Sequence, residues 1–229
     1  MEGSGSRVVE NSGGRRYSAE RREEILMVAL SVLTERGYRS ASMREIAGRA
    51  RASKETLYAW FGDKRGLFEE LVRWQAERID AALAPSFEGE AADVSEVLRD
   101  FAVELQRLLL SERSVVINRA AISEAATDPT LAAALAAKGR DSVVPKLERY
   151  LEGQRERGSL EFEEAGSAVD ALIGLTIGDQ QVRRLLGVLP VPEPGGIEAR
   201  ADWAVTEFLK LFTPRQPPRS MPPRGPRKA

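Results

Sequence analysis

The 229-residue sequence predicts an all-α fold. Between residues 18 and 212, apolar residues recur every three or four positions in each long segment, which is the spacing of a helix that buries one face. Breaks that contain Pro, Gly or Ser separate these segments. Residues 159–163 alternate polar and apolar side chains, but one short isolated run does not make a sheet, so we expect a loop there.

The composition suits a globular protein and excludes several kinds of chemistry. Hydrophobic residues make up 42% of the chain and charged residues 30%, which allows one large or two modest domains with a core. The absence of Cys and His excludes disulfides, thiol nucleophiles, imidazole catalysis and Cys or His metal sites. The sequence gives no reason to expect a cofactor or a metal. It also lacks a membrane-spanning apolar run and the apolar core of a secretory signal, so we expect the protein to stay in the cytoplasm.

The first helix is predicted over residues 18–36. Ser18 is a suitable N-cap, Gly37 follows the last turn, and the apolar residues between them share one face. Residues 1–17 are polar and rich in glycine, and we expect them to be disordered.

Two short helices are predicted next, over residues 43–50 and 54–60. Each follows a serine, Ser42 or Ser53, whose side chain can accept a hydrogen bond from a free backbone N–H at the helix start. Glu45 stands three residues after Ser42, which is the spacing of a capping box. The apolar residues of both helices fall on one stripe, which predicts that the two helices bury a common face.

Two short helices joined by a turn of three or four residues form a helix-turn-helix, in which the second helix presents its first residues to the DNA major groove. The first exposed residues of that helix are Lys54, Glu55 and Thr56, and we predict that they contact base edges. Lys can donate to guanine, Glu can accept from cytosine, and Thr offers a hydroxyl and a methyl group. Glu55 has an alternative role, in which its carboxylate only complements the helix dipole.

A fourth, long helix is predicted from Gly66 to about residue 84, with Pro85 as its stop. The rest of the chain is predicted to form helices over residues 93–111, 114–126, 129–153, 166–186 and 197–212. Pro145 should kink or split the segment in which it lies. Residues 213–229 hold six prolines and five basic residues, so we expect a disordered tail that is either merely solvated or adds weak contacts to DNA.

Charge is divided unevenly along a chain whose net charge is only -1. Residues 39–65 carry seven Lys and Arg against three acidic residues, a net charge of +4. Residues 81–210 carry 14 basic and 22 acidic residues, a net charge of -8. A basic head and an acidic body would orient the protein on a polyanion such as DNA.

Residues 42–68 resemble the TetR family of bacterial transcriptional regulators, whose pattern runs I-A-x-x-A-G-V-S, then L-Y-x-x-F, then K-x-x-L. The matching residues are Ile46, Ala47, Ala50, Ser53, Leu57, Tyr58, Phe61, Lys64 and Leu67. The resemblance implies an N-terminal three-helix helix-turn-helix head, residues 18–65, joined by the long fourth helix to a helical effector-binding and dimerisation body, residues 66–212.

Two residues of the turn depart from the family pattern, since Arg51 replaces Gly and Ala52 replaces Val. A position that favours positive φ suits Gly best, and a longer side chain there costs on the order of 1 kcal/mol. Arg51 is a candidate to bind a phosphate, and a solvated surface side chain is the alternative.

The resemblance also implies which residues anchor the DNA backbone. Phosphate contacts are expected at the two helix N-termini, from the phenol and indole donors of the second helix, and from the lysine that precedes the fourth helix. With Arg51 these are Ser42, Ser53, Tyr58, Trp60 and Lys64. Trp60 has an alternative role as a packing residue.

The body of a TetR-like protein is expected to hold a small-molecule effector and to form a homodimer through its last two long helices. The candidate pocket residues are Trp74, Phe101, Leu105, Asn118, Ile122, Thr176 and Gln180. The candidate dimer residues are Val169, Leu172, Ile173, Thr176 and Ile177 in one helix and Trp203, Phe208 and Leu209 in the other. Apolar members of both sets have an ordinary core position as the alternative.

The sequence therefore favours a ligand-responsive homodimeric regulator, more readily a repressor, that binds a palindromic operator. A second hypothesis is a helical protein-interaction module with this fold that has lost operator recognition, and Arg51 in the turn is its best support. An enzyme is the third hypothesis, but without His or Cys it would depend on carboxylates, Lys or Tyr, and no paired spacing favours any of them.

Overall fold

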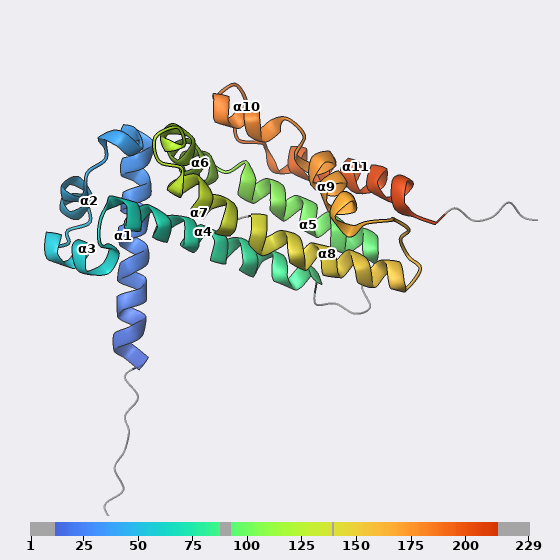
Figure 1. The fold of residues 1–229 in the computed structure, drawn as a ribbon, viewed down its shortest axis with the longest axis horizontal. Coiled ribbons are helices and arrows are strands. Elements are labelled where there is room, and N and C mark those ends of the chain that lie inside the picture. The colour runs from blue at the N-terminus through green and yellow to red at the C-terminus, as the bar shows by residue number, and fades with distance from the viewer. Residues whose placement is uncertain (1–11, 88–92, 139, 215–229) are drawn as a thin grey trace, which may run out of the picture. The chain divides into compact units, whose positions relative to one another are not determined.

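The computed structural model describes residues 12–87, 93–138 and 140–214 (Figure 1). Its described part contains eleven helices and no strand, which confirms the all-α prediction. The helix that was predicted from residue 18 begins at Ser12, so the described end of the N-terminal segment is helical where disorder was expected. The remainder of that segment and nearly all of the basic tail lie outside the described residues. None of the described helices combines the length and the apolar character needed to cross a lipid bilayer.

The helices range from 7 to 29 residues in length, and most of their bounds agree with the sequence pattern to within a few residues. They are α1 (Ser12–Ser40), α2 (Met43–Arg49), α3 (Lys54–Phe61), α4 (Lys64–Phe87), α5 (Val94–Leu109), α6 (Glu112–Glu124), α7 (Thr130–Lys138), α8 (Arg140–Glu156), α9 (Ala165–Ile177), α10 (Gln180–Leu186) and α11 (Pro194–Phe212).

Three further helix bounds differ from the prediction. The expected helix over residues 166–186 is two helices, because Gly178 has φ 53° and ψ -131° and so cannot continue α9 into α10. The break in the segment 129–153 falls between α7 and α8, and Pro145 lies inside α8 on its exposed side, where water can reach the carbonyl that proline leaves unpaired. α4 also runs two residues beyond Pro85.

Interactions between residues close in the sequence determine where the first three helices begin and end. Gly37 has φ 73° and ψ 168°, so it interrupts α1 near its end, as its position after the first apolar stripe predicted. Ser42 caps α2 by accepting a hydrogen bond of 3.2 Å from the backbone N–H of Glu45. Ser53 caps α3 by accepting one of 3.0 Å from Thr56. The reciprocal half of the capping box is replaced by an ion pair, since the Glu45 carboxylate binds Arg49 at 2.7 Å.

The chain folds as two compact units. The first unit comprises Met1–Ala82, Arg107–Val143 and Asp179–Pro192, and the second comprises Leu83–Gln106, Val144–Gly178 and Glu193–Ala229. α6, α7 and α10, which the sequence assigned to the body, therefore belong to the same compact unit as α1, α2 and α3.

The core of the first unit unites the head with α6. α1 packs against α2 and α6, and α2 packs against α3. The most deeply buried side chains of this core include Ile25, Leu57, Phe68, Leu71 and Ile117. α2 and α3 thus rest on the same apolar core as α6.

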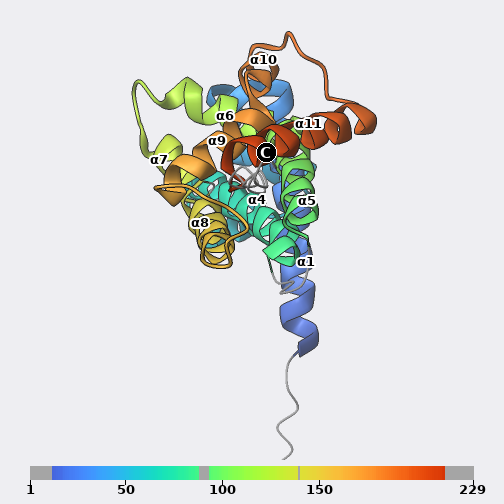
Figure 2. The ribbon, with the colours of Figure 1, turned by 90° about the vertical axis from the view of Figure 1, so that its right-hand side faces the viewer.

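The core of the second unit centres on α9 and α11, which lie side by side (Figures 1 and 2). Leu172 and Phe208 are fully buried there. Gln106 of α5 is also fully buried, and its Nε2 donates to the Ala102 carbonyl at 3.2 Å and the Ile197 carbonyl at 3.1 Å. These bonds tie α5 to the start of α11.

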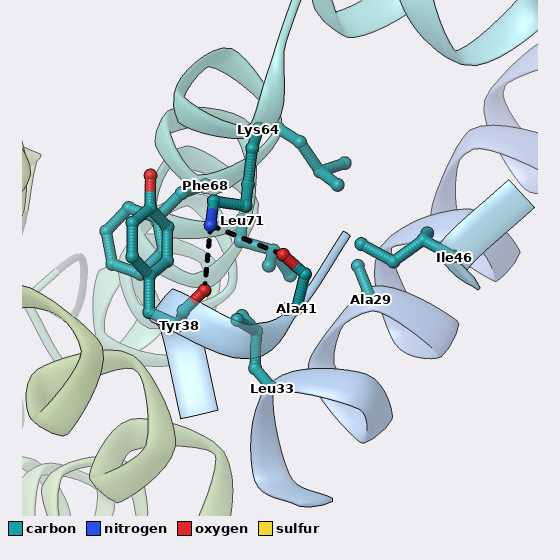
Figure 3. Close-up of a pocket in the computed structure, with 9 residues that line it drawn as sticks. Ala29, Leu33, Tyr38, Ala41, Ile46, Lys64, Phe68 and Leu71 are labelled. Carbon is teal, nitrogen blue, oxygen red and sulfur yellow. Dashed lines mark hydrogen bonds between the residues drawn. The ribbon is translucent and has the colours of Figure 1, made fainter. Parts of the chain in front are cut away.

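Lys64, the first residue of α4, ties the start of α4 to the end of α1. Its Nζ donates to the carbonyl oxygens of Tyr38 at 3.0 Å, Arg39 at 3.3 Å and Ala41 at 3.3 Å. It also lies 4.5 Å from the Tyr38 ring centroid. Figure 3 shows the ammonium group pointing at two of these carbonyls, beside a cavity of about 10 Å³, which has room for about one water molecule. Lys64 therefore satisfies carbonyls that the interrupted helix leaves without a partner.

Gly66 of α4 lies against the end of α3. A Cβ atom on Gly66 would stand 2.1 Å from the Phe61 carbonyl oxygen, and its N–H donates to the Asp63 side chain at 2.8 Å. The sharp turn between α3 and α4 thus has no room for a side chain at this residue.

Replacing Gly66 with Ala should destabilise the protein by at least about 2 kcal/mol, because the clashing atom is backbone and cannot rotate away. Urea denaturation measures the effect. Gly48→Ala is the matched control, since a Cβ there meets no atom within 4 Å in a helix, and Ala should add up to about 1 kcal/mol of stability. Equal stability of the two variants would contradict the close approach.

Replacing Lys64 with Met should lower the free energy of unfolding by about 2 kcal/mol, because partly buried carbonyls lose their donor while the aliphatic stem remains. The exposed Lys54→Met is the control and should change stability by less than about 0.5 kcal/mol. Chemical denaturation measures the free energy of unfolding of both variants. Equal values for Lys64→Met and Lys54→Met would refute the capping role of Lys64.

Candidate nucleic-acid interface

The first turn of α3 exposes two of the three side chains predicted to read bases. Lys54 and Glu55 are exposed, whereas Thr56 is partly buried and its hydroxyl lies 3.0 Å from the Ser53 hydroxyl. Hydrogen bonds from its own backbone N–H and from the Ser53 hydroxyl hold the pKa of the Glu55 carboxyl below its usual value. Glu55 thus interacts with the helix start, which is the alternative role considered for it.

The predicted phosphate-binding side chains of α2 and α3 differ in how far they are available. Ser42 and Ser53 are exposed, although each oxygen already caps its helix. The Tyr58 side chain is 50% exposed, so its phenol can reach a ligand. Trp60 is partly buried, and its ring packs edge-on against Phe61 with centroids 6.3 Å apart.

The turn between α2 and α3 contains a residue in the left-handed conformation, as its place in the family pattern suggested. Arg51 has φ 51°, the one positive φ of a non-glycine residue in the described part of the chain. Its N–H donates to Gly48 at 3.2 Å, and the N–H of Ala52 donates to Ala47 at 3.0 Å. The turn therefore keeps its backbone bonds with Arg in place of Gly.

Arg21 of α1 holds this turn from outside the helix-turn-helix, and the sequence pattern gave no sign of it. Its Nη2 donates to the Ala50 carbonyl at 2.5 Å and to the Arg51 carbonyl at 3.1 Å, while Nη1 pairs with Glu24 at 2.6 Å. A cation that binds the carbonyls at the end of α2 also complements the negative end of that helix. Arg21 thus helps to fix the direction in which α3 leaves the turn.

The basic residues of the head divide into engaged and available cations. Arg49 pairs with Glu35 and Glu45, each at 2.7 Å, and Lys64 is held by backbone carbonyls. The side chains of Arg44, Arg51 and Lys54 are exposed and have no hydrogen-bond or ion-pair partner among the described residues. Arg44 was missed as a candidate contact, although its place on the outer side of α2, next to Ser42, could have indicated it.

The candidate effector residues fall in both compact units. Phe101, Leu105 and Thr176 are buried in the second unit, and the hydroxyl of Thr176 has no hydrogen-bond partner in the described part of the chain. The other four belong to the first unit and are Trp74, Asn118, Ile122 and Gln180.

The environments of these four differ, and Gln180 is partly buried at the start of α10. Asn118 donates to the Ser114 carbonyl at 2.9 Å within its own helix, and Ile122 is 59% exposed. Trp74 packs at the edge of the core beside two arginines.

Most candidate dimer residues are core residues of the second unit. The buried ones are Val169, Leu172, Thr176, Ile177 and Phe208, while Ile173 and Leu209 are partly buried. Trp203 is 45% exposed, and α11 also exposes Leu211.

Two family models match the chain. The model for bacterial regulatory proteins of the tetR family matches residues 25–71, which hold α2 and α3. The model for the C-terminal domain of AefR-like transcriptional repressors matches residues 96–214, more than half of the chain.

A curated relative matches part of the chain. The HTH-type transcriptional activator FasR of Mycolicibacterium smegmatis is 45% identical over 67 residues, which span 29% of this chain and 31% of that relative.

Solved structures match along most of both chains. A TetR-family regulator from Mesorhizobium loti aligns with a TM-score of 0.76 and 26% identity, over 86% of this chain and 98% of that one. The flavonoid-responsive regulator FrrA aligns with a TM-score of 0.69 and 28% identity, over 86% of this chain and 100% of that one.

A TetR regulator from Agrobacterium tumefaciens aligns with a TM-score of 0.67 and 31% identity, over 83% of this chain and 94% of that one. Together with the two family matches and the helix-turn-helix geometry of α2 and α3, this likeness shows that the chain belongs to the TetR family of bacterial DNA-binding transcriptional regulators, a family without enzymatic activity.

Proposed function

We propose that the chain is a ligand-responsive repressor that binds a palindromic operator as a homodimer. The observation that carries the operator proposal is the outer side of the helix-turn-helix, where Arg44, Arg51 and Lys54 are exposed cations without a partner among the described residues. Cations left unpaired on a reading head are available to phosphates and base edges. Acting on chromosomal DNA, the protein would work in the bacterial cytoplasm.

Base reading falls first to Lys54, with Glu55 and Thr56 as weaker readers because both side chains interact with the start of α3. Phosphate contacts fall to Tyr58, Ser42, Ser53, Arg51 and Trp60, and we add Arg44. Lys64 contributes by holding the end of α1, since its ammonium is occupied by carbonyls. Helix N-termini at Ser42 and Ser53 would add backbone N–H donors to the phosphates.

We favour repression over activation because the family model that matches the C-terminal part of the chain describes AefR-like transcriptional repressors. The activator with which the head shares 45% identity matches over less than a third of each chain, so its mode of action carries little weight here. Dimerisation is supported by the apolar side chains that α11 exposes, Trp203 and Leu211, on a helix packed against α9. Two identical heads would then match two half-sites related by a two-fold axis.

In this proposal, an effector releases the dimer from its operator by shifting the equilibrium between two conformations of the dimer. A ligand drives it only through unequal affinity for the two states, one of which places the heads at a spacing that fits the operator. The second unit offers buried polar atoms to such a ligand, because Thr176 Oγ1 and Gln106 Oε1 have no hydrogen-bond partner among the described residues. Buried polar groups of this kind call for a partner such as a water or a ligand.

The test is selection of bound fragments from genomic DNA, with and without a pool of metabolites. We expect enrichment of a palindromic site, binding that weakens steeply as salt rises, and loss of the site in the metabolite pool. Failure of a folded dimer to enrich any site would favour the protein-interaction module instead.

Replacing Lys54 with Ala should weaken binding to the selected site roughly 5- to 100-fold and relax preference at one base pair, since a base contact is lost. Tyr58→Phe should weaken binding by a smaller factor, roughly fivefold, without changing sequence preference, because it removes one phosphate donor. Fluorescence anisotropy with the selected duplex and point variants of it measures both effects.

The matched control is Lys210→Ala, which removes an exposed lysine of α11 that pairs with Glu207 at 2.7 Å. Its affinity should equal that of the parent. If Lys54→Ala and Lys210→Ala behaved alike, base reading by Lys54 would be refuted.

Replacing Arg21 with Ala should weaken operator binding, because the turn that aims α3 loses two hydrogen bonds. In a protein that also carries Arg51→Gly, the Arg21→Ala change should cost about 1 kcal/mol less binding free energy than it does in the parent. The reason is that Gly holds a left-handed turn without strain. A double-mutant cycle of operator affinities gives this coupling, with the exposed Arg183→Ala as the matched control. Strictly additive effects of the Arg21 and Arg51 changes would show that Arg21 acts elsewhere.

A further inference from the structure

Two arginines of the first unit lie against one tryptophan, outside the DNA-reading surface. The Arg113 Cζ lies 4.6 Å from the Trp74 ring centroid, and the Arg78 Cζ lies 5.2 Å from it. Trp74 and Arg78 belong to α4, and Arg113 lies in the first turn of α6. The indole thus brings two guanidinium groups of different helices into one place.

The positive charge of Arg113 is poorly compensated. Among the described residues it has no ion-pair partner, and its one hydrogen-bond acceptor is the Met27 sulfur at 3.9 Å. Burial lowers the pKa of Arg113, the charge of Arg78 lowers it further, and only Glu23 acts in the opposite direction. Its surroundings therefore disfavour the charged form on two counts.

Neighbouring acids are engaged by other groups. Glu23 pairs with Arg78 at 3.4 Å, in a contact where both side chains are about half exposed. Glu112, the residue before Arg113, binds the buried Arg184 at 2.7 Å. The first turn of a helix carries a partial positive charge of its own, which adds to the excess. Among the described residues, Glu23 is thus the one carboxylate found to act on both guanidinium groups.

We propose that Arg78 and Arg113, placed on Trp74, bind the oxyanion group of a small organic molecule, a phosphate or a carboxylate. Guanidinium groups donate paired N–H bonds that match either oxyanion. Because the Glu23 pair is long and exposed, Arg78 can turn from it toward an anion at little loss. Met27, 41% exposed beside Arg113, offers apolar surface to the rest of the molecule.

This inference builds on the proposed response to an effector and names a chemical class for it. α6 shares its core with α1 and α2, so an anion at Arg113 would bind the same compact unit that reads DNA. The test below uses no DNA, so that failure of anion binding and failure of operator binding are observed separately.

The fluorescence of Trp74 can report anion binding directly. Of the three tryptophans, Trp60 and Trp203 are changed to Phe, and the fluorescence of the remaining Trp74 is followed during titration with sodium pyrophosphate, sodium benzoate or, at matched ionic strength, sodium chloride. We expect a saturable change with at least one of the two oxyanions and none with chloride. A response to chloride equal to that of both oxyanions would overturn the proposal.

Arg113→Gln in this background should weaken oxyanion binding at least about tenfold, since a charge-assisted hydrogen bond is lost. Arg73→Gln is the matched control, because Arg73 is an exposed arginine of α4 that pairs with Glu70, and its binding should equal that of the parent. Unchanged oxyanion binding in Arg113→Gln would refute the site.

Thermal unfolding in chloride buffer separates a ligand site from a structural arginine. Because Arg113→Gln removes an uncompensated charge, the Tm of this variant should equal or exceed that of the parent. Pyrophosphate or benzoate should raise the Tm of the parent and leave that of Arg113→Gln unchanged. A lower Tm of Arg113→Gln in chloride would show that the guanidinium stabilises the fold and would overturn the proposal.

Discussion

The carbonyl groups at the ends of α1 and α2 are the constraint on which the DNA-reading head depends. A helix leaves its last carbonyls without partners in the helix, and backbone N–H groups of the turns after α1 and α2 satisfy only some of them. Lys64 supplies three hydrogen bonds after the interruption of α1, and Arg21 supplies two after α2. Both side chains come from other helices, so each bond also fixes an angle between helices. Lys64 thus holds the start of α4 against the end of α1, and Arg21 holds the turn from which α3 leaves. Neither cation belongs to α2 or α3.

This use of cations changes what the basic composition of the head means. A net charge of +4 over residues 39–65 predicted attraction to DNA, but it did not show which cations are available. Lys64 and Arg49 are bound within the unit, and the available charge is concentrated on Arg44, Arg51 and Lys54. Net charge predicts where a polyanion docks, whereas hydrogen-bond partners decide which side chains hold it.

The sequence predicted most of the features that arise within a few residues. Ser42 and Ser53 cap their helices, Gly37 interrupts the first helix, and Arg51 takes a positive φ, because each depends on neighbours close in the chain. It did not predict that Arg21 binds a turn about thirty residues away, since apolar periodicity carries no information about such partners. The same reason explains why the pattern did not separate buried from exposed effector candidates: Phe101 and Ile122 follow the same helical spacing, yet Phe101 is buried and Ile122 is exposed.

Arg51 has a further consequence through the unfolded state. A glycine in the turn would relieve the strain of a positive φ in the folded chain, but it would also widen the range of conformations open to the unfolded chain. These two effects oppose each other and are of similar size, about 1 kcal/mol or less. The turn can therefore carry arginine with little change in the folding equilibrium. The exposed guanidinium that the proposed phosphate contact uses is thus compatible with a stable turn.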